Sequence, residues 1–252
     1  MAEQLSVRAV FQATAASSEY VYTESRCVPI DIIRQIWGDF DFSYLISILL
    51  AAVPSLFCIT LHETAHGLTA LWLGDKTAQR EGRLTLNPIK HLDLMGLLML
   101  LVFHFGWAKP VPVNPRNFKN PKLGMSITAL AGPLCNFLIT VLFLFLYGLL
   151  FRRLSGHSTG ELFLELIQMT AILSLGLCIF NLLPIPPLDG SKILAALLPR
   201  RLYYYLMLYE RYGMILLLVL VWTGILGRPF NRLLSTIFRS LMSIASFSAG
   251  LI

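Results

Sequence analysis

Long stretches without any charged residue dominate the chain. Three of them are long enough for a membrane-spanning helix: Phe42–Leu61 with 20 residues, Leu123–Phe151 with 29 and Leu166–Leu188 with 23. About 20 apolar residues cross the hydrocarbon core of a bilayer as a helix, so each stretch predicts one transmembrane helix. Tyr212–Gly227 has 16 uncharged residues, and with its aromatic and arginine neighbours it predicts a fourth span.

Two shorter stretches predict elements that do not cross the membrane. Leu94–Ala108 has 15 residues, which is too short for a span, so we expect a re-entrant or interfacial segment. Ser240–Ile252 has 13 uncharged residues and predicts an interfacial helix. The expected fold is therefore an all-α integral membrane protein with about four transmembrane helices and a re-entrant segment. Its regions are an N-terminal extension (1–41), a polytopic membrane core (42–228) and a membrane-associated tail (229–252).

Composition and charge support this class. Hydrophobic residues make up 56% of the 252 residues and charged residues 13%, which is about half the charged share of a soluble domain. The net charge of +6 comes from lysines and arginines that lie between the apolar stretches. This placement is typical of the positive-inside rule, so the expected partners are the lipid bilayer and membrane proteins and not nucleic acid. Cys58, Cys135 and Cys178 lie inside apolar stretches, which indicates buried thiols and no disulfide framework.

A pair of histidines marks the candidate chemistry. The segment His62–His66 reads H-E-x-x-H at the end of the first apolar stretch. Residues four apart share one face of a helix, so His62 and His66 can bind one metal ion, and Glu63 can polarise a water on that metal. The short pattern alone is weakly specific, but charged and polar groups in a membrane helix cost free energy and are rare without a function. The alternative is that these histidines lie past the membrane edge and are merely interfacial.

A catalytic zinc site commonly has three protein ligands, so a third is needed. Asp189 is the better candidate, because it follows Pro184–Pro187, whose three prolines cannot continue a helix and unwind the end of an apolar stretch. Such irregular backbone needs protein or water around it, and a carboxylate there is explained if it meets a cation. Asp189 is also a favourable N-cap for a helix that begins at Gly190, and both interpretations stay open. Glu81 is a weaker candidate, because its charged loop favours a solvated carboxylate.

The distribution of charge predicts that Asp189 reaches the histidines. Two basic segments follow the first span: Lys76, Arg80, Arg83 and Lys90, then Lys109, Arg116, Lys119 and Lys122. The positive-inside rule puts both segments, and the histidine end of the first span, in the cytoplasm if Leu94–Ala108 re-enters. The next two spans then cross out and back, which returns Asp189 to the cytoplasmic side. If Leu94–Ala108 crossed the bilayer, Asp189 would lie on the opposite face.

Five motifs together resemble the site-2 protease family of intramembrane zinc metalloproteases. The match is closest to its compact bacterial branch, which lacks PDZ and CBS domains. The motifs are His62–Gly67, Gly82–Pro88, Gly106–Pro115, Ala131–Asn136 and Asn181–Gly190. Their common order makes the resemblance far more specific than H-E-x-x-H alone.

The resemblance implies a role for each site residue. It implies that His62, His66 and Asp189 bind one zinc ion (Zn²⁺) per chain. It implies that Glu63 is the general base. Asn181 is implied to help hold the substrate carbonyl or the oxyanion, and a hydrogen bond to backbone freed near the prolines is an equally open interpretation.

Two further expectations concern neighbouring segments. Asn136 lies deep in a long span, where a helix–helix hydrogen bond is favoured over a catalytic role. The resemblance also implies a short membrane-associated β-hairpin, in which Arg83–Leu86 forms an edge that pairs with an unwound substrate.

The expected function is an intramembrane zinc metalloendopeptidase of the cell membrane, with its active site near the cytoplasmic side. Its expected substrate is a membrane protein, cut within or next to a transmembrane helix by a zinc-activated water with Glu63 as base. Three alternatives stay open: a non-catalytic membrane zinc-binding protein, an inactive scaffold that binds helices, and a metallopeptidase for soluble peptides.

Overall fold

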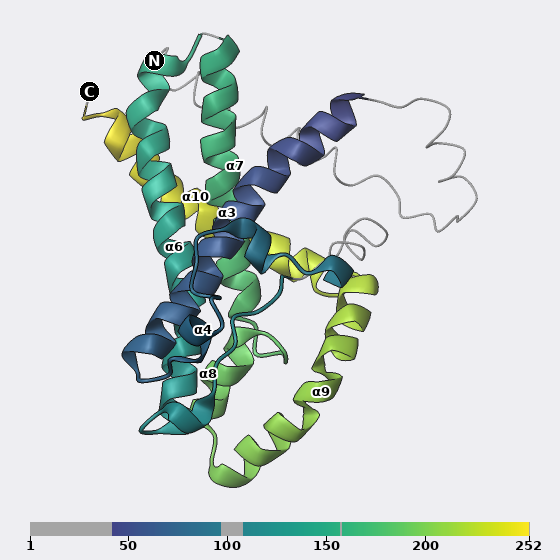
Figure 1. The fold of residues 1–252 in the computed structure, drawn as a ribbon. Coiled ribbons are helices and arrows are strands. Elements are labelled where there is room, and N and C mark those ends of the chain that lie inside the picture. The colour runs from purple at the N-terminus through teal and green to yellow at the C-terminus, as the bar shows by residue number, and fades with distance from the viewer. Residues whose placement is uncertain (1–41, 97–107, 157, 252) are drawn as a thin grey trace. The chain divides into compact units, whose positions relative to one another are not determined.

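The computed structural model describes residues 42–96, 108–156 and 158–251. The chain divides into two compact units, residues 1–46 and 47–252, and the candidate site lies within the second. Every regular element of the described residues is helical (Figure 1). The α-helices are α3 (Phe42–Trp72), α4 (Thr77–Arg80), α6 (Pro121–Leu154), α7 (Ser158–Asn181), α8 (Asp189–Leu197), α9 (Arg200–Trp222) and α10 (Gly227–Ala249), and the 3₁₀ helices are η1 (Pro88–His91) and η2 (Pro115–Asn117).

Two of the described helices are long and apolar enough to cross a membrane, namely α6 with 34 residues and α7 with 24. They correspond to two of the predicted spans, 123–151 and 166–188. Tyr212–Trp222 and α10 qualify together as a pair bent by 83°, which gives up to three spans. The helical membrane class is confirmed, and the count of four spans stays a prediction.

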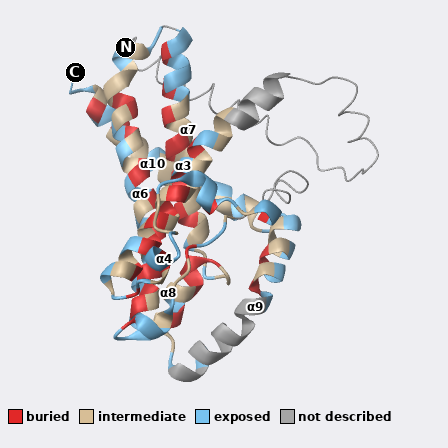
Figure 2. Ribbon diagram, viewed as in Figure 1, coloured by how far each residue is buried: buried red, intermediate tan, exposed pale blue. Residues whose placement is uncertain are grey.

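The α6–α7 hairpin is the frame on which the site is built. The side chain of Asn120 accepts a hydrogen bond from Leu123 N and caps α6, and Pro121 suits the first turn because it needs no donor there. The prolines after α7 end that helix at Asn181. Between the helices, the Ser174 hydroxyl donates to the backbone oxygen of Asn136 at 2.8 Å, a short polar contact of the kind that holds membrane helices together. Figure 2 shows buried residues gathered where α3, α6 and α8 meet.

Asp75 ties the loop after α3 to the loop before α6. The chain leaves α3 through Gly74, whose φ of +106° favours glycine. The buried carboxylate of Asp75 then accepts hydrogen bonds from Thr77 N at 3.0 Å, Asn114 N at 2.7 Å and Asn117 Nδ2 at 2.7 Å. Burial alone would raise the pKa of Asp75, but these hydrogen bonds outweigh it and hold the pKa below its usual value. The segment 110–117 is thereby fixed next to the end of α3.

The predicted re-entrant segment is described only at its ends, because residues 97–107 lie outside the described residues. Leu92 and Ala108 form an antiparallel bridge, and Lys109 N donates to the His91 oxygen at 2.9 Å. A segment whose two ends pair must return to the place it left, which a re-entrant element requires. In the described part of the chain this bridge is the sole β pairing, and residues 83–86 are irregular, so the β-hairpin stays a prediction.

The predicted C-terminal tail forms most of α10, which packs on the α6–α7 hairpin. Ala245 and Ser248 are buried against Gly148 of α6. At the other end of α10, the ring of Phe230 lies 6.2 Å from that of Phe180 in α7. The prediction that this part of the chain lies at the membrane surface as an interfacial helix stays a prediction.

Candidate metal and active site

Helix α3 presents His62 and His66 on one face, as their spacing predicts. Both rings are buried, and their Nε2 atoms lie 3.0 Å apart. This convergence follows directly from four-residue spacing on a continuous helix.

Helix α8 brings the third candidate ligand to the histidines. One oxygen of Asp189, Oδ2, lies 3.2 Å from Nε2 of His62 and 3.1 Å from Nε2 of His66. The N-cap of α8 is Leu188, and no side chain makes a cap hydrogen bond there, so the interpretation of Asp189 as a helix cap is wrong.

These three groups fit a zinc ion. Their ligand atoms all lie within 4.8 Å of one another, and the residues are buried. Zinc binds imidazole nitrogen and carboxylate oxygen at about 2.0–2.2 Å in tetrahedral geometry, which separates ligand atoms by roughly 3.3 Å. The spacings of 3.0–3.2 Å between these atoms are close to that value. Glu81, the other carboxylate considered, is exposed and lies outside this group.

Gly132 of α6 leaves the space that the rings occupy. A Cβ atom at this position would lie 2.5 Å from Cε1 and Nε2 of His66 and 2.6 Å from Cε1 of His62. Real Cβ contacts are not that short, so only glycine lets α6 pass this close to the two rings.

The outer nitrogens of both rings also contact α6. Nδ1 of His66 donates to the Thr128 oxygen at 2.7 Å. Nδ1 of His62 lies 3.1 Å from the side-chain amide of Asn136. Such outer partners orient metal-binding histidines. This contact joins α6 to α3, so the predicted helix–helix hydrogen bond of Asn136 is confirmed, and its partner is a candidate ligand.

Glu63 lies beside the candidate ligands, and the segment that follows the Leu92–Ala108 bridge holds its carboxylate in place. Its Oε2 accepts a hydrogen bond from Val111 N at 2.8 Å. The donor comes from the fixed segment 110–117, so this loop sets the direction of the carboxylate.

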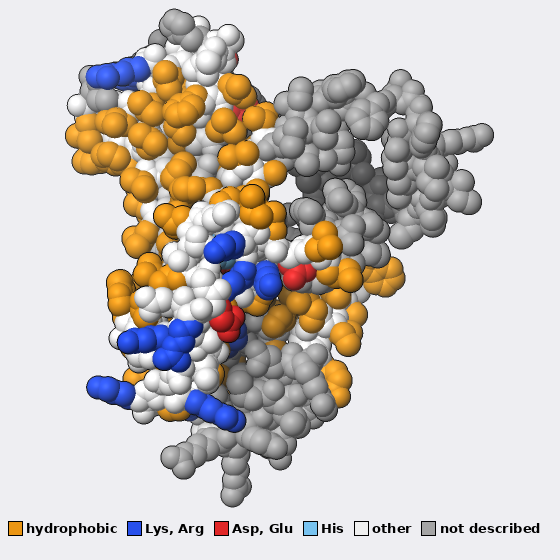
Figure 3. All heavy atoms as spheres, viewed as in Figure 1, with side chains coloured by type: hydrophobic (Ala, Val, Ile, Leu, Met, Phe, Trp, Pro, Cys, Tyr) orange, Lys and Arg blue, Asp and Glu red, His pale blue; other side chains and the backbone are white. Residues whose placement is uncertain are grey.

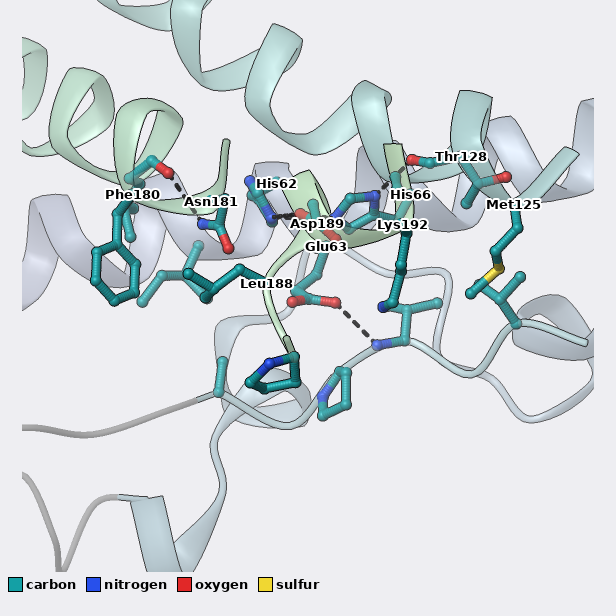
Figure 4. A pocket seen from close by; sticks show the side chains of 18 of the residues that line it. His62, Glu63, His66, Met125, Thr128, Phe180, Asn181, Leu188, Asp189 and Lys192 are labelled. Carbon is teal, nitrogen blue, oxygen red and sulfur yellow. Dashed lines mark hydrogen bonds and ion pairs between the residues drawn. The ribbon is translucent and has the colours of Figure 1, made fainter. Parts of the chain in front are cut away.

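Asn181 is the last residue of α7 and lines the same cavity as the ligands (Figure 4). Its Nδ2 donates to the Leu177 oxygen of its own helix at 3.0 Å. The backbone partner is therefore in α7 and not in the proline segment that the sequence suggested.

The site opens into a cavity of about 550 Å³ (Figure 4). Its walls come from α3, α6, α7, α8, α9 and the segment 108–113. Most lining side chains are apolar, among them Val111, Val113, Met125, Phe180 and Leu217. Lys192 of α8 also lines the cavity.

Comparison with other proteins gives the family of this chain. A Bacillus subtilis (strain 168) protein, YwhC, named as a candidate zinc metalloprotease, is 43% identical over 176 residues, which are 67% of this chain and 78% of that protein. The Rip2 protein of Mycolicibacterium smegmatis, named in the same way, is 32% identical over 203 residues, 78% of this chain and 75% of its own. The family model described as Peptidase family M50 matches residues 150–223. The chain belongs to peptidase family M50, the site-2 proteases. No solved structure matches the chain significantly.

Membership of the M50 family confirms the predicted class of membrane zinc metalloprotease. The direct family match covers Asn181 and Asp189 and ends before α10. Motif reasoning found the three candidate ligands and Glu63. It missed the contacts of Thr128, Gly132 and Asn136 with the rings, although two of these residues lie in a motif, Ala131–Asn136, that the sequence had singled out.

Proposed function

We propose that this M50 protein is an intramembrane endopeptidase, which hydrolyses a peptide bond of a membrane-embedded or membrane-adjacent substrate. The observation that carries the proposal is the convergence of two Nε2 atoms and one carboxylate oxygen on one point, with a second carboxylate, Glu63, in the same cavity. A mere zinc carrier needs the three ligands but has no use for Glu63.

His62, His66 and Asp189 would hold the zinc ion. Bound zinc supplies a Lewis acid, which lowers the pKa of water and polarises a carbonyl. In the proposed reaction Glu63 accepts the proton of the attacking water and later gives it to the leaving amine. The Val111 N–H keeps the carboxylate of Glu63 in place for both transfers.

Asn181 is proposed to stabilise the oxyanion. Its amide carries two N–H groups, and one is used by the Leu177 oxygen. The other can donate to negative charge that develops on a substrate carbonyl in the cavity.

The cavity favours a hydrophobic substrate, as a transmembrane helix is. Its walls are largely apolar, whereas the groups that do chemistry gather at one side of it. A helix hides its amides in its own hydrogen bonds, so the substrate must unwind locally before its carbonyl can enter.

The protein is proposed to cross the cell membrane with about four helices. Its active site is proposed to lie near the cytoplasmic surface of that membrane. Figure 3 shows Lys and Arg side chains gathered over α4 and the loop before α6, whereas hydrophobic side chains cover the face along α6 and α7. The positive-inside rule favours the cytoplasm for such a region. Water would reach the site from that side.

Metal analysis and a cleavage assay test this function together. We expect about one zinc per chain in detergent-purified protein and a large loss in Asp189→Ala. In proteoliposomes that contain single-span helices, mass spectrometry should detect cleavage by the wild type and a loss of about 10²–10⁴-fold in Glu63→Gln. Zinc binding with no cleavage that depends on Glu63 would favour the zinc-binding or scaffold alternative. Preferential cleavage of short soluble peptides would favour the metallopeptidase alternative.

A further inference from the structure

We propose that Asn136 is a positioning residue for His62: its amide oxygen accepts a hydrogen bond from Nδ1–H, which keeps the Nε2 lone pair directed at the metal. This inference rests on the proposed zinc site and assigns a function to a residue of α6 that is not a ligand. The proposal follows from the hydrogen-bond chemistry of the two histidines.

His66 shows what each ring needs. Its Nδ1 lies 2.7 Å from the Thr128 oxygen, and a carbonyl can only accept. Nδ1 of His66 therefore carries a proton. In a neutral imidazole the other nitrogen, Nε2, then has the lone pair that a metal requires.

His62 needs the same arrangement, because its Nε2 also faces Asp189. The atom placed next to its Nδ1 is Nδ2 of the Asn136 amide, at 3.1 Å. An amide can present either NH₂ or oxygen to a neighbour after a half-turn of its end group. Only the oxygen accepts from Nδ1–H, so only that orientation leaves the Nε2 lone pair of the neutral ring free for a metal.

Asn136 is buried beside His62. The residue is 0% exposed, so water does not replace its partners. With NH₂ turned towards His62, the oxygen Oδ1 has no hydrogen-bond partner, which is unfavourable for a buried acceptor. Turning the oxygen towards Nδ1–H gives this acceptor a donor and leaves NH₂ in the place of Oδ1, so the requirement of a metal for the Nε2 lone pair decides the orientation.

The backbone of Asn136 is also held in place. Its carbonyl accepts from the Ser174 hydroxyl of α7 at 2.8 Å and from the Thr140 hydroxyl at 3.0 Å. These contacts fix the origin of the side chain relative to the hairpin. They also offer a control, because they can be removed without touching the amide.

The test measures zinc affinity, by competition with a chromophoric chelator, in detergent-purified variants. Asn136→Leu has a similar size but cannot accept a hydrogen bond, and we expect zinc binding about 10–100-fold weaker. Asn136→Asp offers only acceptors, and we expect affinity within a few-fold of the wild type. Ser174→Ala removes the contact to the backbone and leaves the amide, so thermal stability should fall while zinc affinity stays.

The outcomes separate this inference from the proposed function. If Asn136→Leu folds and binds zinc as tightly as the wild type, the inference is wrong and the zinc site stands. The inference is also wrong if Asn136→Asp loses affinity as Asn136→Leu does, or if Ser174→Ala weakens binding equally. If Asn136→Leu does not fold, the zinc affinity of Asn136→Asp relative to the wild type decides: affinity within a few-fold supports the inference, and a large loss overturns it. Absence of zinc from the wild type overturns both proposals.

Discussion

Gly132 sets how closely α6 approaches the candidate metal ligands. No side chain fits between this backbone and the rings of His62 and His66, because even a Cβ would lie 2.5–2.6 Å from ring atoms. A methyl group here must push the rings or the whole helix away. Since the ligand atoms need their spacing within a few tenths of an ångström, either movement separates them from Asp189.

Gly132→Ala is therefore expected to lose most of its zinc while retaining the helical fold. The matched control is Gly176→Ala on α7, where the nearest atom to a new Cβ is Phe230 Cζ at 3.9 Å, an ordinary contact. Metal content per chain and circular dichroism of both variants check this. Normal zinc content in a folded Gly132→Ala would contradict the close approach of α6 to the rings.

At the level of elements, the loop between the Leu92–Ala108 bridge and α6 positions one residue of the site, Glu63. Val111 reaches Glu63 because the segment 110–117 is anchored at Asp75 and by Arg83, whose guanidinium donates to the Lys109 oxygen at 2.8 Å. The orientation of Glu63, the proposed general base, thus depends on hydrogen bonds outside the cavity.

The anchor at Asp75 should depend on pH. Its pKa in the folded protein lies below the usual value of about 3.9. A lowered pKa means that folding favours the ionised form, so the stabilisation is present above about pH 4 and is lost as pH falls through the folded pKa. Asp75→Asn cannot satisfy all the same donors, and we expect it to cost about 1–3 kcal/mol near pH 7.

Unfolding in detergent between pH 3 and pH 7 checks this prediction. The difference in stability between the wild type and Asp75→Asn should be constant from pH 5 to pH 7 and shrink below pH 4. Asp93→Asn serves as the control, because within the described residues the hydrogen bond that the Asp93 carboxylate accepts is a local one from Gly96 N. A difference that stays the same down to pH 3 would show that ionisation of Asp75 is not what holds the loop.

How far the sequence predicts these elements depends on how local each signal is. The spacing of His62 and His66 and the proline segment before Asp189 are local patterns, so both led to the candidate ligands. The contacts of Gly132 and Asn136 with the rings depend on where α6 crosses α3, which no local pattern contains. The packing of α10 on Gly148 has the same origin, because small residues mark a close crossing without naming the partner helix.

For the whole molecule, the orientation of α6 decides which compartment supplies water to the site. A helix of 34 residues is about 50 Å long and exceeds the roughly 30 Å hydrocarbon core, so its two ends can reach opposite surfaces. Lys119 and Ser155 are exposed beyond these ends. We expect Lys119, which lies near the ligand side, to face the cytoplasm.

Cysteine labelling in intact cells tests this orientation. In a Cys27→Ser background, a membrane-impermeant maleimide should label Ser155→Cys before permeabilisation and Lys119→Cys only after it. The unmodified background measures labelling of the three cysteines in the described helices, of which Cys58 and Cys178 are buried. The reverse pattern would place the ligands on the outer side and remove the reason for a cytoplasmic water path. Equal labelling of both positions before permeabilisation would mean that α6 does not separate two compartments. The prediction of a re-entrant segment between Leu92 and Ala108 would then lose the support that it takes from the topology.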